Sequence, residues 1–341
     1  MEPFHAFRAA FLAPPGRKEK IDAAAVRSSV GISVQRLLPF EMEYRLLGST
    51  ALRVSVIGIG TWQFGGEWGR TFSQDEVDAI LHEASGCGIN LIDTAECYGD
   101  HLSETLVGDY LSRHGREKWF VATKFGHYFN RFMDRTDDFS PEGVRLQLEA
   151  SLRALRIETI DLYQFHSGSD DLFRNEALWT LLDSQKRAGK IRHLGISILG
   201  KGSERQAKQA HEVGAEVLQV VYNRLDRRPE ELYFPHAERD RLGILARVPL
   251  ASGLLSGKYS PGTTFPAGDV RSTFDAEKMK ANLAELAQIR REEVPPGVPM
   301  SEWALAWCLK NPVVSAVIPG CKDPAQVKSN AAAAEWVSPI A

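Results

Sequence analysis

The sequence predicts a single (β/α)8 TIM barrel, a closed α/β fold. Short β-branched runs alternate with helix-length stretches along most of the chain, and this alternation is typical of a parallel sheet covered by helices. Eight such units in about 300 residues fit one closed barrel better than two open sheets. A doubly wound sheet would need a G-x-G-x-x-G turn after its first strand, whereas Gln63 takes the place of the third glycine after Gly58 and Gly60.

The predicted elements alternate in order along the chain. Strands are expected at residues 54–59, 90–94, 119–124, 161–166, 193–197, 217–222, 243–248 and 315–319. Helices are expected at 74–85, 103–112, 141–155, 176–188, 203–213 and 229–241, as a pair within 276–309, and at 324–333. Pro141 and Pro324 suit a first helical turn, and Ser140 and Asp323 before them suit the N-cap position.

Composition and charge exclude several classes of protein. The chain has 341 residues, 43% of them hydrophobic and 25% charged, which is typical of a globular protein that buries a substantial core. A net charge of -3 provides no basic face for nucleic acid, and no apolar run approaches the roughly 18–20 residues of a membrane span. The four cysteines are scattered without the spacing of a metal or redox motif, so a reducing compartment, the cytoplasm, is expected.

Residues 1–41 differ from the rest of the chain. They show no sustained helical or strand period, and their four acidic residues argue against an organelle transit peptide, which is typically poor in acids. We expect either a disordered extension or upstream sequence from a misassigned start, for which Met42 would be a natural beginning. The predicted organisation is therefore an extension at 1–41 and a barrel at 42–341.

Four ionisable residues lie at or just beyond the ends of three consecutive predicted strands. They are Asp93, Tyr98, Lys124 and His166, hereafter the tetrad. The active site of a (β/α)8 barrel lies at the C-terminal ends of its strands, so the fold would gather these four side chains around one mouth. Taken alone, each of the four has a purely structural alternative. Asp93 could cap a turn, Tyr98 could be an ordinary loop aromatic, Lys124 could be paired with a carboxylate, and His166 could be a structural histidine. Their convergence at one end of the barrel favours a functional site.

The chemistry of the tetrad suits proton delivery to a carbonyl oxygen. A tyrosine hydroxyl with its reference pKa of about 10 is a poor proton donor at neutral pH, but a neighbouring ammonium such as that of Lys124 stabilises the phenolate and lowers this pKa. Asp93 would keep the lysine charged and in place, and His166 would assist or orient the acceptor. The chain has no G-x-S-x-G elbow and no His-x-His pair, which argues against a serine hydrolase or a metal hydrolase.

Several blocks of the sequence resemble the signature of the aldo-keto reductase superfamily. They appear in the family's order and nearly without gaps from about residue 42 to residue 334, and the first 41 residues fall outside the resemblance. The blocks are 90–99 (NLIDTAECYG), 103–104, 106–108, 121–124 (VATK), 160–166 (IDLYQFH), 189–197 (GKIRHLGIS), 249–259 (PLASGLLSGKY) and 318–322 (IPGCK), followed by Gln326 and Asn330.

The resemblance implies a barrel that binds NADPH and passes hydride from it to a small aldehyde or ketone. Tyr98 would protonate the carbonyl oxygen with help from Lys124 and Asp93, while His166 would orient the carbonyl through a hydrogen bond. No metal, nucleic acid or membrane partner is implied.

The resemblance also implies a set of cofactor contacts. Ser197 and Gln219 would hold the nicotinamide carboxamide, and small residues along 250–258 would let the pyrophosphate approach. Lys322 is suited to a 2′-phosphate, which favours NADPH over NADH, although a solvated loop lysine is the alternative. The remaining cofactor candidates are Leu250, Ser252, Leu254, Ser256, Lys258, Gly320, Gln326 and Asn330.

Three positions depart from the family pattern. Ile198 follows Ser197 where many members have an asparagine, so one amide ligand of the cofactor is missing. Arg247 stands where many members stack a tyrosine on the nicotinamide; its guanidinium can stack on the ring, but its charge predicts weaker binding of the oxidised cofactor. Residues 167–171 (SGSDD) replace a common Trp-Pro pair in the wall of the substrate pocket.

Aromatic residues near the predicted mouth are candidate substrate contacts, with packing beneath loops as the alternative. They are Trp62, Phe64, Tyr128 and Phe129. Cys97 beside Tyr98 could sense oxidants if it is exposed, although a small buried filler is the simpler expectation.

Two other functions stay open from the sequence. One is a regulatory or interaction subunit that binds the cofactor with slow or no turnover, because an intact tetrad does not exclude such relatives. The other is a sugar-binding or isomerase barrel without redox chemistry. The sequence predicts neither the physiological substrate nor the oligomeric state.

Overall fold

The computed structural model describes residues 41–199, 204–260 and 262–337. The predicted N-terminal extension lies, apart from Glu41, outside the described residues, and so does the expected start of a helix at Ser203. Within the described part, an eight-stranded parallel sheet has the order β12-β11-β10-β9-β8-β5-β4-β3. Its strands are β3 (Ile59–Gly60), β4 (Leu91–Asp93), β5 (Phe120–Phe125), β8 (Ile160–His166), β9 (Ile191–Ser197), β10 (Ala215–Val221), β11 (Gly243–Arg247) and β12 (Val314–Val317).

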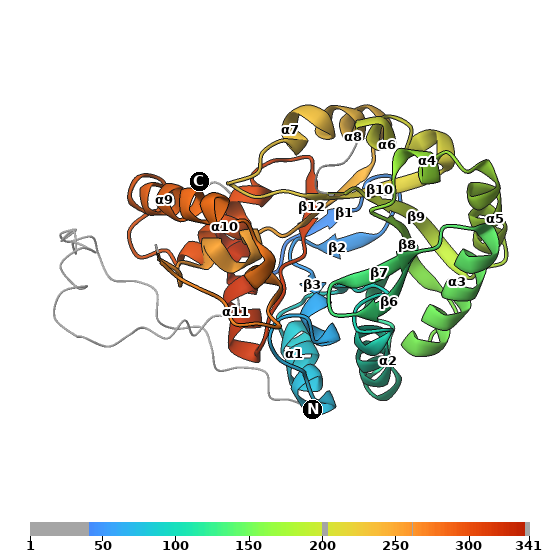
Figure 1. Cartoon of the computed structure of the whole chain (residues 1–341), viewed down its shortest axis with the longest axis horizontal. Helices are drawn as coiled ribbons and strands as arrows, with labels where there is room; N and C mark the ends of the chain where they lie inside the picture. The colour runs from blue at the N-terminus through green and yellow to red at the C-terminus, as the bar shows by residue number, and fades with distance from the viewer. Residues whose placement is uncertain (1–40, 200–203, 261, 338–341) are drawn as a thin grey trace, which may run out of the picture. The chain divides into compact units, whose positions relative to one another are not determined.

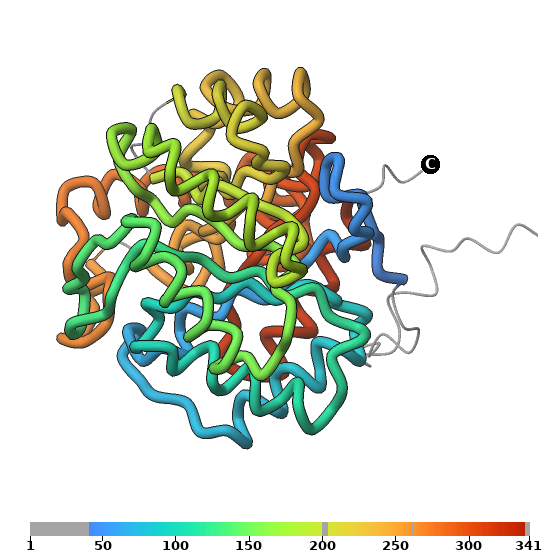
Figure 2. The backbone as a smooth tube through the Cα atoms, turned by 90° about the vertical axis from the view of Figure 1, so that its right-hand side faces the viewer, coloured from blue at the N-terminus to red at the C-terminus, as the bar shows by residue number. Residues whose placement is uncertain are grey.

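The sheet closes between its first and last strands. Parallel bridges join Ile57 to Val317 and Gly60 to Gly320, and the Val317 N–H donates to the carbonyl of Val56 at 2.9 Å. Figure 2 shows the N-terminal and C-terminal ends of the coloured chain side by side, as this closure requires. The predicted (β/α)8 barrel is therefore confirmed.

Helices follow the strands and cover the outside of the barrel (Figure 1). Several begin at the predicted caps: the Ser140 hydroxyl accepts the N–H of Gly143, and the Asp323 carboxylate accepts the N–H of Gln326. The longer helices are α1 (Gln74–Gly86), α2 (Leu102–His114), α3 (Pro141–Leu155), α5 (Glu176–Arg187), α8 (Phe234–Asp240), α9 (Ala276–Glu292), α10 (Met300–Leu309) and α11 (Pro324–Ala332). Shorter helical segments are η2 (Trp62–Gly65), α4 (Asp170–Phe173), α6 (Glu204–Lys208), η3 (His211–Val213), α7 (Pro229–Leu232), η4 (Ala251–Ser256), η5 (Val270–Thr273) and η6 (Ala333–Trp336).

Two hairpins differ from the predicted elements. The first predicted strand, 54–59, is divided, because β2 (Arg53–Ser55) pairs antiparallel with β1 (Tyr44–Leu46) and only the end of the run joins the barrel as β3. A second hairpin, β6 (His127–Arg131) with β7 (Asp134–Asp137), follows β5. Its residues are partly or fully exposed, so it lacks the buried alternation by which strands are recognised.

The barrel interior is built in layers. Side chains two residues apart on a strand point to the same face, so each strand contributes to successive layers. The lower layer is apolar and is closed from below by Leu47 of the first hairpin, which is 1% exposed. Its other members are Val54, Leu91, Ala122, Leu162, Val217, Leu245 and Ala316; Ile318, two residues beyond Ala316, packs on this cluster and also lines the cavity described below.

Within the described residues, no helix combines the length and the apolar character that crossing a membrane would require.

Candidate active site

The tetrad comes together directly above the apolar layer. The Lys124 ammonium donates to Asp93 Oδ1 at 2.7 Å, to the Thr94 carbonyl at 2.7 Å and to the Tyr98 hydroxyl at 3.3 Å. The rings of Tyr98 and His166 meet edge to face, with their centroids 6.2 Å apart. Side chains from three strands and the loop after β4 therefore converge at the C-terminal ends of the strands, as the barrel rule requires.

Asp93 is the centre of a buried polar network. Its Oδ2 accepts hydrogen bonds from Gln219 Nε2 at 2.7 Å and from Gln164 Nε2 at 3.2 Å, while Lys124 occupies Oδ1. All four side chains are almost completely buried. A buried ion pair is tolerated only where hydrogen bonds satisfy its remaining lone pairs, and the two glutamines meet this requirement.

Burial dominates the protonation of Tyr98 and Lys124. It raises the pKa of Tyr98 to about 12, although the neighbouring ammonium acts in the opposite direction. This is the reverse of the acidic phenol expected from the sequence, because loss of water around a phenolate outweighs the effect of one cation. Burial disfavours the Lys124 ammonium, but the Asp93 charge prevails and the pKa of Lys124 is raised. At neutral pH the pair is thus a protonated phenol beside an ammonium.

His166 is held as a neutral imidazole. Burial lowers its pKa well below the ordinary value, and charge interactions with His127 and Lys124 act in the same direction. The thiol of Cys97, whose pKa burial raises to about 12, lies 3.7 Å from His166 Nδ1, and the tautomer of the ring decides which of the two groups donates. In the tautomer that accepts at Nδ1, the ring proton sits on Nε2 and that nitrogen can donate to a carbonyl oxygen.

Glycine contacts fix the loop that carries Tyr98. A Cβ added to Gly65 would lie 2.5 Å from the carbonyl carbon of Tyr98, and one added to Gly99 would lie 2.6 Å from the carbonyl oxygen of Gly65. Gly99 also has a φ of 70°, which favours glycine. The backbones of the loops after β3 and β4 therefore touch directly and set the position of the phenol.

Glu67 joins three segments around the mouth. It is 2% exposed; its Oε2 accepts from Trp62 Nε1 at 2.8 Å and from Arg135 Nη2, and its Oε1 accepts from the Met133 N–H at 2.9 Å. Its carbonyl accepts from the Val270 N–H at 3.1 Å. One carboxylate residue thus connects the loop after β3, the β6–β7 hairpin and the segment at η5.

A cavity of about 250 Å³ runs from the tetrad across the mouth of the barrel. Tyr98, Asp93 and Trp62 line one part of it, and Lys322 and Arg271 line another. Nine of the cofactor candidates line it: Gln219, Arg247, Leu250, Ser252, Ser256, Lys258, Gly320, Lys322 and Gln326. Ser197, Leu254 and Asn330 are buried and are not part of its lining; Leu254 packs in an apolar cluster with residues of α9 and α10.

Positive side chains gather around Lys322. Burial lowers the pKa of this lysine, and the neighbouring guanidinium of Arg271 adds to the effect. Arg271 is itself held in a bidentate ion pair with Asp269, at 2.9 Å and 2.6 Å. Lys258 also lines the cavity. A lysine destabilised by nearby cations would be stabilised by an anion, so this region suits a phosphate.

The four aromatic candidates lie in different places. Trp62 stacks on Tyr98 with centroids 6.0 Å apart and lines the cavity. Phe64 is fully buried and packs edge to face on Phe72, so it has no surface to offer a substrate. Tyr128 and Phe129 lie on the exposed β6–β7 hairpin and do not line the cavity.

Sequence reasoning missed several residues of the site. Gln164 carried a usable signal, because it lies two positions before His166 on one strand and must share its face. Glu67 lies in a loop, as does Trp68, which lines the cavity, and Arg271 lies in the single turn of η5; these segments are too short for a periodicity that predicts which way a side chain points. The sequence places Cys97 beside Tyr98, but nothing in it predicts the contact of the thiol with His166.

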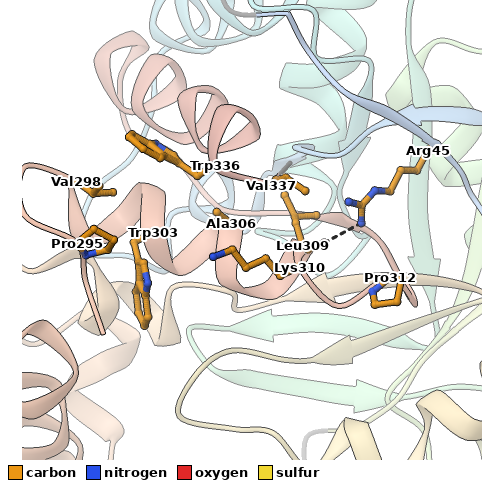
Figure 3. Close-up of a pocket in the computed structure, with 10 residues that line it drawn as sticks. All are labelled: Arg45, Pro295, Val298, Trp303, Ala306, Leu309, Lys310, Pro312, Trp336 and Val337. Atoms are coloured by element: carbon orange, nitrogen blue, oxygen red, sulfur yellow. Dashed lines mark hydrogen bonds between the residues drawn. The ribbon is translucent and has the colours of Figure 1, made fainter. Parts of the chain in front are cut away.

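A second cavity of about 780 Å³ lies away from the tetrad (Figure 3). Arg45 on its border donates to the carbonyls of Leu309 and Val314, and Val314 begins β12, so this cavity lies near the N-terminal end of that strand. Its lining is largely apolar, with Trp303 and Trp336 among the side chains. It has none of the chemistry of the first cavity.

Comparisons with known proteins agree with this architecture. Residues 56–339 match the Aldo/keto reductase family. The chain is 34% identical over 304 residues to the NADH-specific methylglyoxal reductase of Escherichia coli (strain K12), covering 84% of this chain and 92% of that protein. Among solved structures, the holo form of aldo-keto reductase AKR11C1 from Bacillus halodurans has a TM-score of 0.73 at 30% identity, covering 86% of this chain and 91% of that one. Glycerol dehydrogenase AKR11B4 from Gluconobacter oxydans has a TM-score of 0.73 at 32% identity, covering 85% and 89%. The chain belongs to the aldo/keto reductase family.

Proposed function

We propose that this oxidoreductase reduces an aldehyde or ketone to an alcohol with NADPH, and that Tyr98 is the general acid. The observation that carries the proposal is the 3.3 Å contact between the Tyr98 hydroxyl and the Lys124 ammonium, at the wall of a cavity that also reaches a cluster of cations. The family uses a nicotinamide cofactor on small carbonyl compounds, and the position of the tetrad is consistent with that use.

Unpartnered polar atoms support a bound dinucleotide. Arg247 lines the cavity, and its Nε has no hydrogen-bond partner among the residues that the structure describes. Ser197 Oγ and Asn330 Nδ2 are also buried without a partner among the described residues but lie outside the lining, so they would contact the cofactor only after a local adjustment. Ala251, Ser252 and Gly253 have left-handed φ angles, so the chain makes an irregular turn beside the cavity. Such loops expose N–H groups to a phosphate.

Each member of the tetrad has a distinct role in the proposed reaction. Bound NADPH supplies a hydride to the carbonyl carbon. Tyr98 donates its hydroxyl proton to the carbonyl oxygen, and Lys124 stabilises the phenolate that remains. Asp93 keeps Lys124 charged and oriented, and His166 donates from Nε2 to the same carbonyl oxygen. Trp62, stacked on Tyr98, forms one wall for the substrate.

A phenylalanine substitution tests the role of Tyr98. We expect Tyr98→Phe to lower kcat for aldehyde reduction by about 10²–10⁴-fold, which is typical of loss of a general acid, while NADPH still binds. Tyr163→Phe is the matched control, because the buried Tyr163 hydroxyl has no partner among the described residues. NADPH oxidation with reactive aldehydes measures the rate, and cofactor fluorescence measures binding. A Tyr98→Phe enzyme with full activity would refute the proposal.

The preference for NADPH over NADH rests on the cations around Lys322. Lys322, Arg271 and Lys258 would bind a 2′-phosphate, which NADH lacks. We expect Lys322→Glu to weaken NADPH binding at least tenfold and to leave NADH binding within a few-fold. Equal losses for both cofactors would contradict the assignment of Lys322 to the phosphate.

Arg247 is proposed to favour the reduced cofactor. Its Nη2 donates to the Ile198 carbonyl at 3.0 Å, and burial lowers its pKa without a carboxylate in direct contact among the described residues. A positive nicotinamide ring beside this guanidinium would be repelled, whereas the neutral reduced ring would not. We expect Arg247→Met to tighten NADP⁺ binding relative to NADPH; an unchanged ratio of the two dissociation constants would contradict this role.

A further inference from the structure

We propose that Glu96, Cys97 and His166 form a binding site for a thiophilic divalent cation, of the class of Zn²⁺ or Cd²⁺. The site lies on the Nδ1 side of His166, where the Cys97 thiol contacts the ring. It uses side-chain atoms that the proposed reduction does not need, since that reaction uses Nε2 of the histidine. The inference therefore stands independently of the proposed function.

The ligand atoms are spaced for a small ion. One ligand atom from each of the three residues lies within 4.8 Å of the other two, and Cys97 Sγ is 3.7 Å from His166 Nδ1. In a tetrahedral zinc site with bonds of about 2.3 Å to sulfur and about 2.0 Å to nitrogen, these two atoms stand about 3.5 Å apart. The sulfur and nitrogen thus already have nearly the spacing of two zinc ligands, whereas the Glu96 oxygen, within 4.8 Å of both, would have to move toward them.

The Glu96 carboxylate supplies a second, independent indication of a ligand. Glu96 is 2% exposed, and its Oε2 has no hydrogen-bond partner among the described residues. Its other oxygen accepts the His127 N–H at 2.9 Å, which anchors the carboxylate beside the cluster. A buried carboxylate oxygen without a partner is costly unless a cation or a donor approaches it.

The ligand set selects the class of ion. A thiolate and an imidazole favour Zn²⁺ and similar soft or borderline ions, whereas Mg²⁺ and Ca²⁺ prefer sets made of oxygen atoms. Binding displaces the thiol proton of Cys97 and the proton that the buried Glu96 carboxyl carries at neutral pH; both protons leave to solvent, and His166 binds through the lone pair on Nδ1. With three protein ligands, a water molecule would complete the tetrahedron. Of the three residues only His166 is partly exposed, so an ion would have to enter beside its ring.

Cadmium titration tests the site directly. The full-length chain, prepared without a polyhistidine tag and stripped of cofactor, is titrated with Cd²⁺ while the ultraviolet charge-transfer absorbance of cadmium thiolate is recorded. We expect one equivalent to produce the band and an excess of Mg²⁺ to leave it unchanged. Cys97→Ser should abolish the band, and Glu96→Gln and His166→Asn should each weaken Cd²⁺ binding on the order of tenfold or more.

Matched variants keep the test decisive. Cys87→Ser removes the partly exposed thiol of α1's C-cap and should leave the band intact. Tyr98→Phe should abolish reduction and leave Cd²⁺ binding intact, so failure of one proposal is distinguishable from failure of the other. Should Cys97→Ser not fold, His166→Asn still tests the site with the thiol in place. Absence of the band in the unaltered chain, or its loss in Cys87→Ser and not in Cys97→Ser, would overturn the proposal.

Discussion

Two adjacent layers of the barrel interior are formed by the same strands but differ in polarity. The lower layer contains Leu91, Ala122, Leu162 and Val217, which pack with one another and exclude water. Two residues further along the same four strands stand the members of the upper layer, Asp93, Lys124, Gln164 and Gln219. A step of two residues thus separates a wholly apolar environment from an equally buried polar one.

The difference between the two layers shows how a buried polar site is stabilised in the folded chain. Burial of apolar side chains in the lower layer contributes favourable free energy of folding, whereas burial of Lys124 and Asp93 carries a desolvation cost. The upper layer offsets that cost only through mutual hydrogen bonds. We therefore expect substitutions in the lower layer to affect stability alone, and substitutions in the upper layer to affect both stability and activity.

Breaking the ion pair of the upper layer should have the largest effect. Lys124→Met would leave the Asp93 carboxylate buried with only its two glutamine donors. We expect the free energy of unfolding to fall by about 3–5 kcal/mol. We also expect kcat/KM for carbonyl reduction to fall by about 10²–10⁴-fold. Denaturant titration and steady-state kinetics measure the two effects.

The double variant Lys124→Met with Asp93→Asn separates stability from activity. Removing both charges should restore most of the lost stability while the rate stays low, because the unpaired charge is gone but the proton-delivery group is not rebuilt. A double variant no more stable than Lys124→Met would show that the unpaired Asp93 charge does not cause the loss of stability.

A truncation in the lower layer should have the next largest effect, on stability only. Leu162 is 1% exposed and lies two residues before Gln164. We expect Leu162→Ala to lower the free energy of unfolding by about 2–5 kcal/mol and to leave kcat/KM within a few-fold. A loss of activity above tenfold in the folded variant would mean that the two layers are mechanically coupled.

Substitution of Glu67 should give a smaller effect, confined to the mouth. Glu67→Gln keeps the shape of the side chain but removes the charge that Arg135 and Trp62 contact. We expect a loss of about 1–3 kcal/mol in stability and higher KM values for both carbonyl substrate and cofactor. Glu142→Gln, in an exposed ion pair with Arg145, is the control and should change stability by about 0.5 kcal/mol or less.

The smallest effect is expected for an ion pair outside the barrel. Burial alone would lower the pKa of His101, but its hydrogen bond and charge interaction with Glu104 prevail and raise it. The stabilisation from His101 is therefore fully present below the ordinary histidine pKa and is lost as the pH rises through the raised value. His101→Asn keeps a residue that tolerates the left-handed φ of 63°. Unfolding at pH 5.5 and pH 9 should show a larger deficit for the variant at the lower pH.

The barrel and the tetrad were predictable because both follow from strand ends. A β-branched run that stops at a polar residue, as at Asp93 and Lys124, marks the place where a parallel strand reaches the mouth. The closure of the sheet then brings distant residues together. Extending the two-residue period beyond His166 would have added Gln164 to the prediction.

Other parts of the site left no periodic signal. The β6–β7 hairpin is exposed on both faces, and Glu67 contacts two segments that are distant in sequence, the hairpin and η5. The pKa of Tyr98 could not be foreseen either, because its direction depends on how much water surrounds the phenol and not on which cation is nearby. The sequence pattern predicts which residues take part in the site, whereas their packing in the folded chain determines their pKa values.

The backbone contact between Gly65 and Tyr98 bears on which nearby residues can be substituted without moving the phenol. Because main chain contacts main chain there, the position of the Tyr98 loop depends on two glycines and not on the packing of a side chain between the two loops. If Tyr98 is the acid that we propose, substitutions at Trp62 or in the hairpin could change the substrates while this backbone contact is kept.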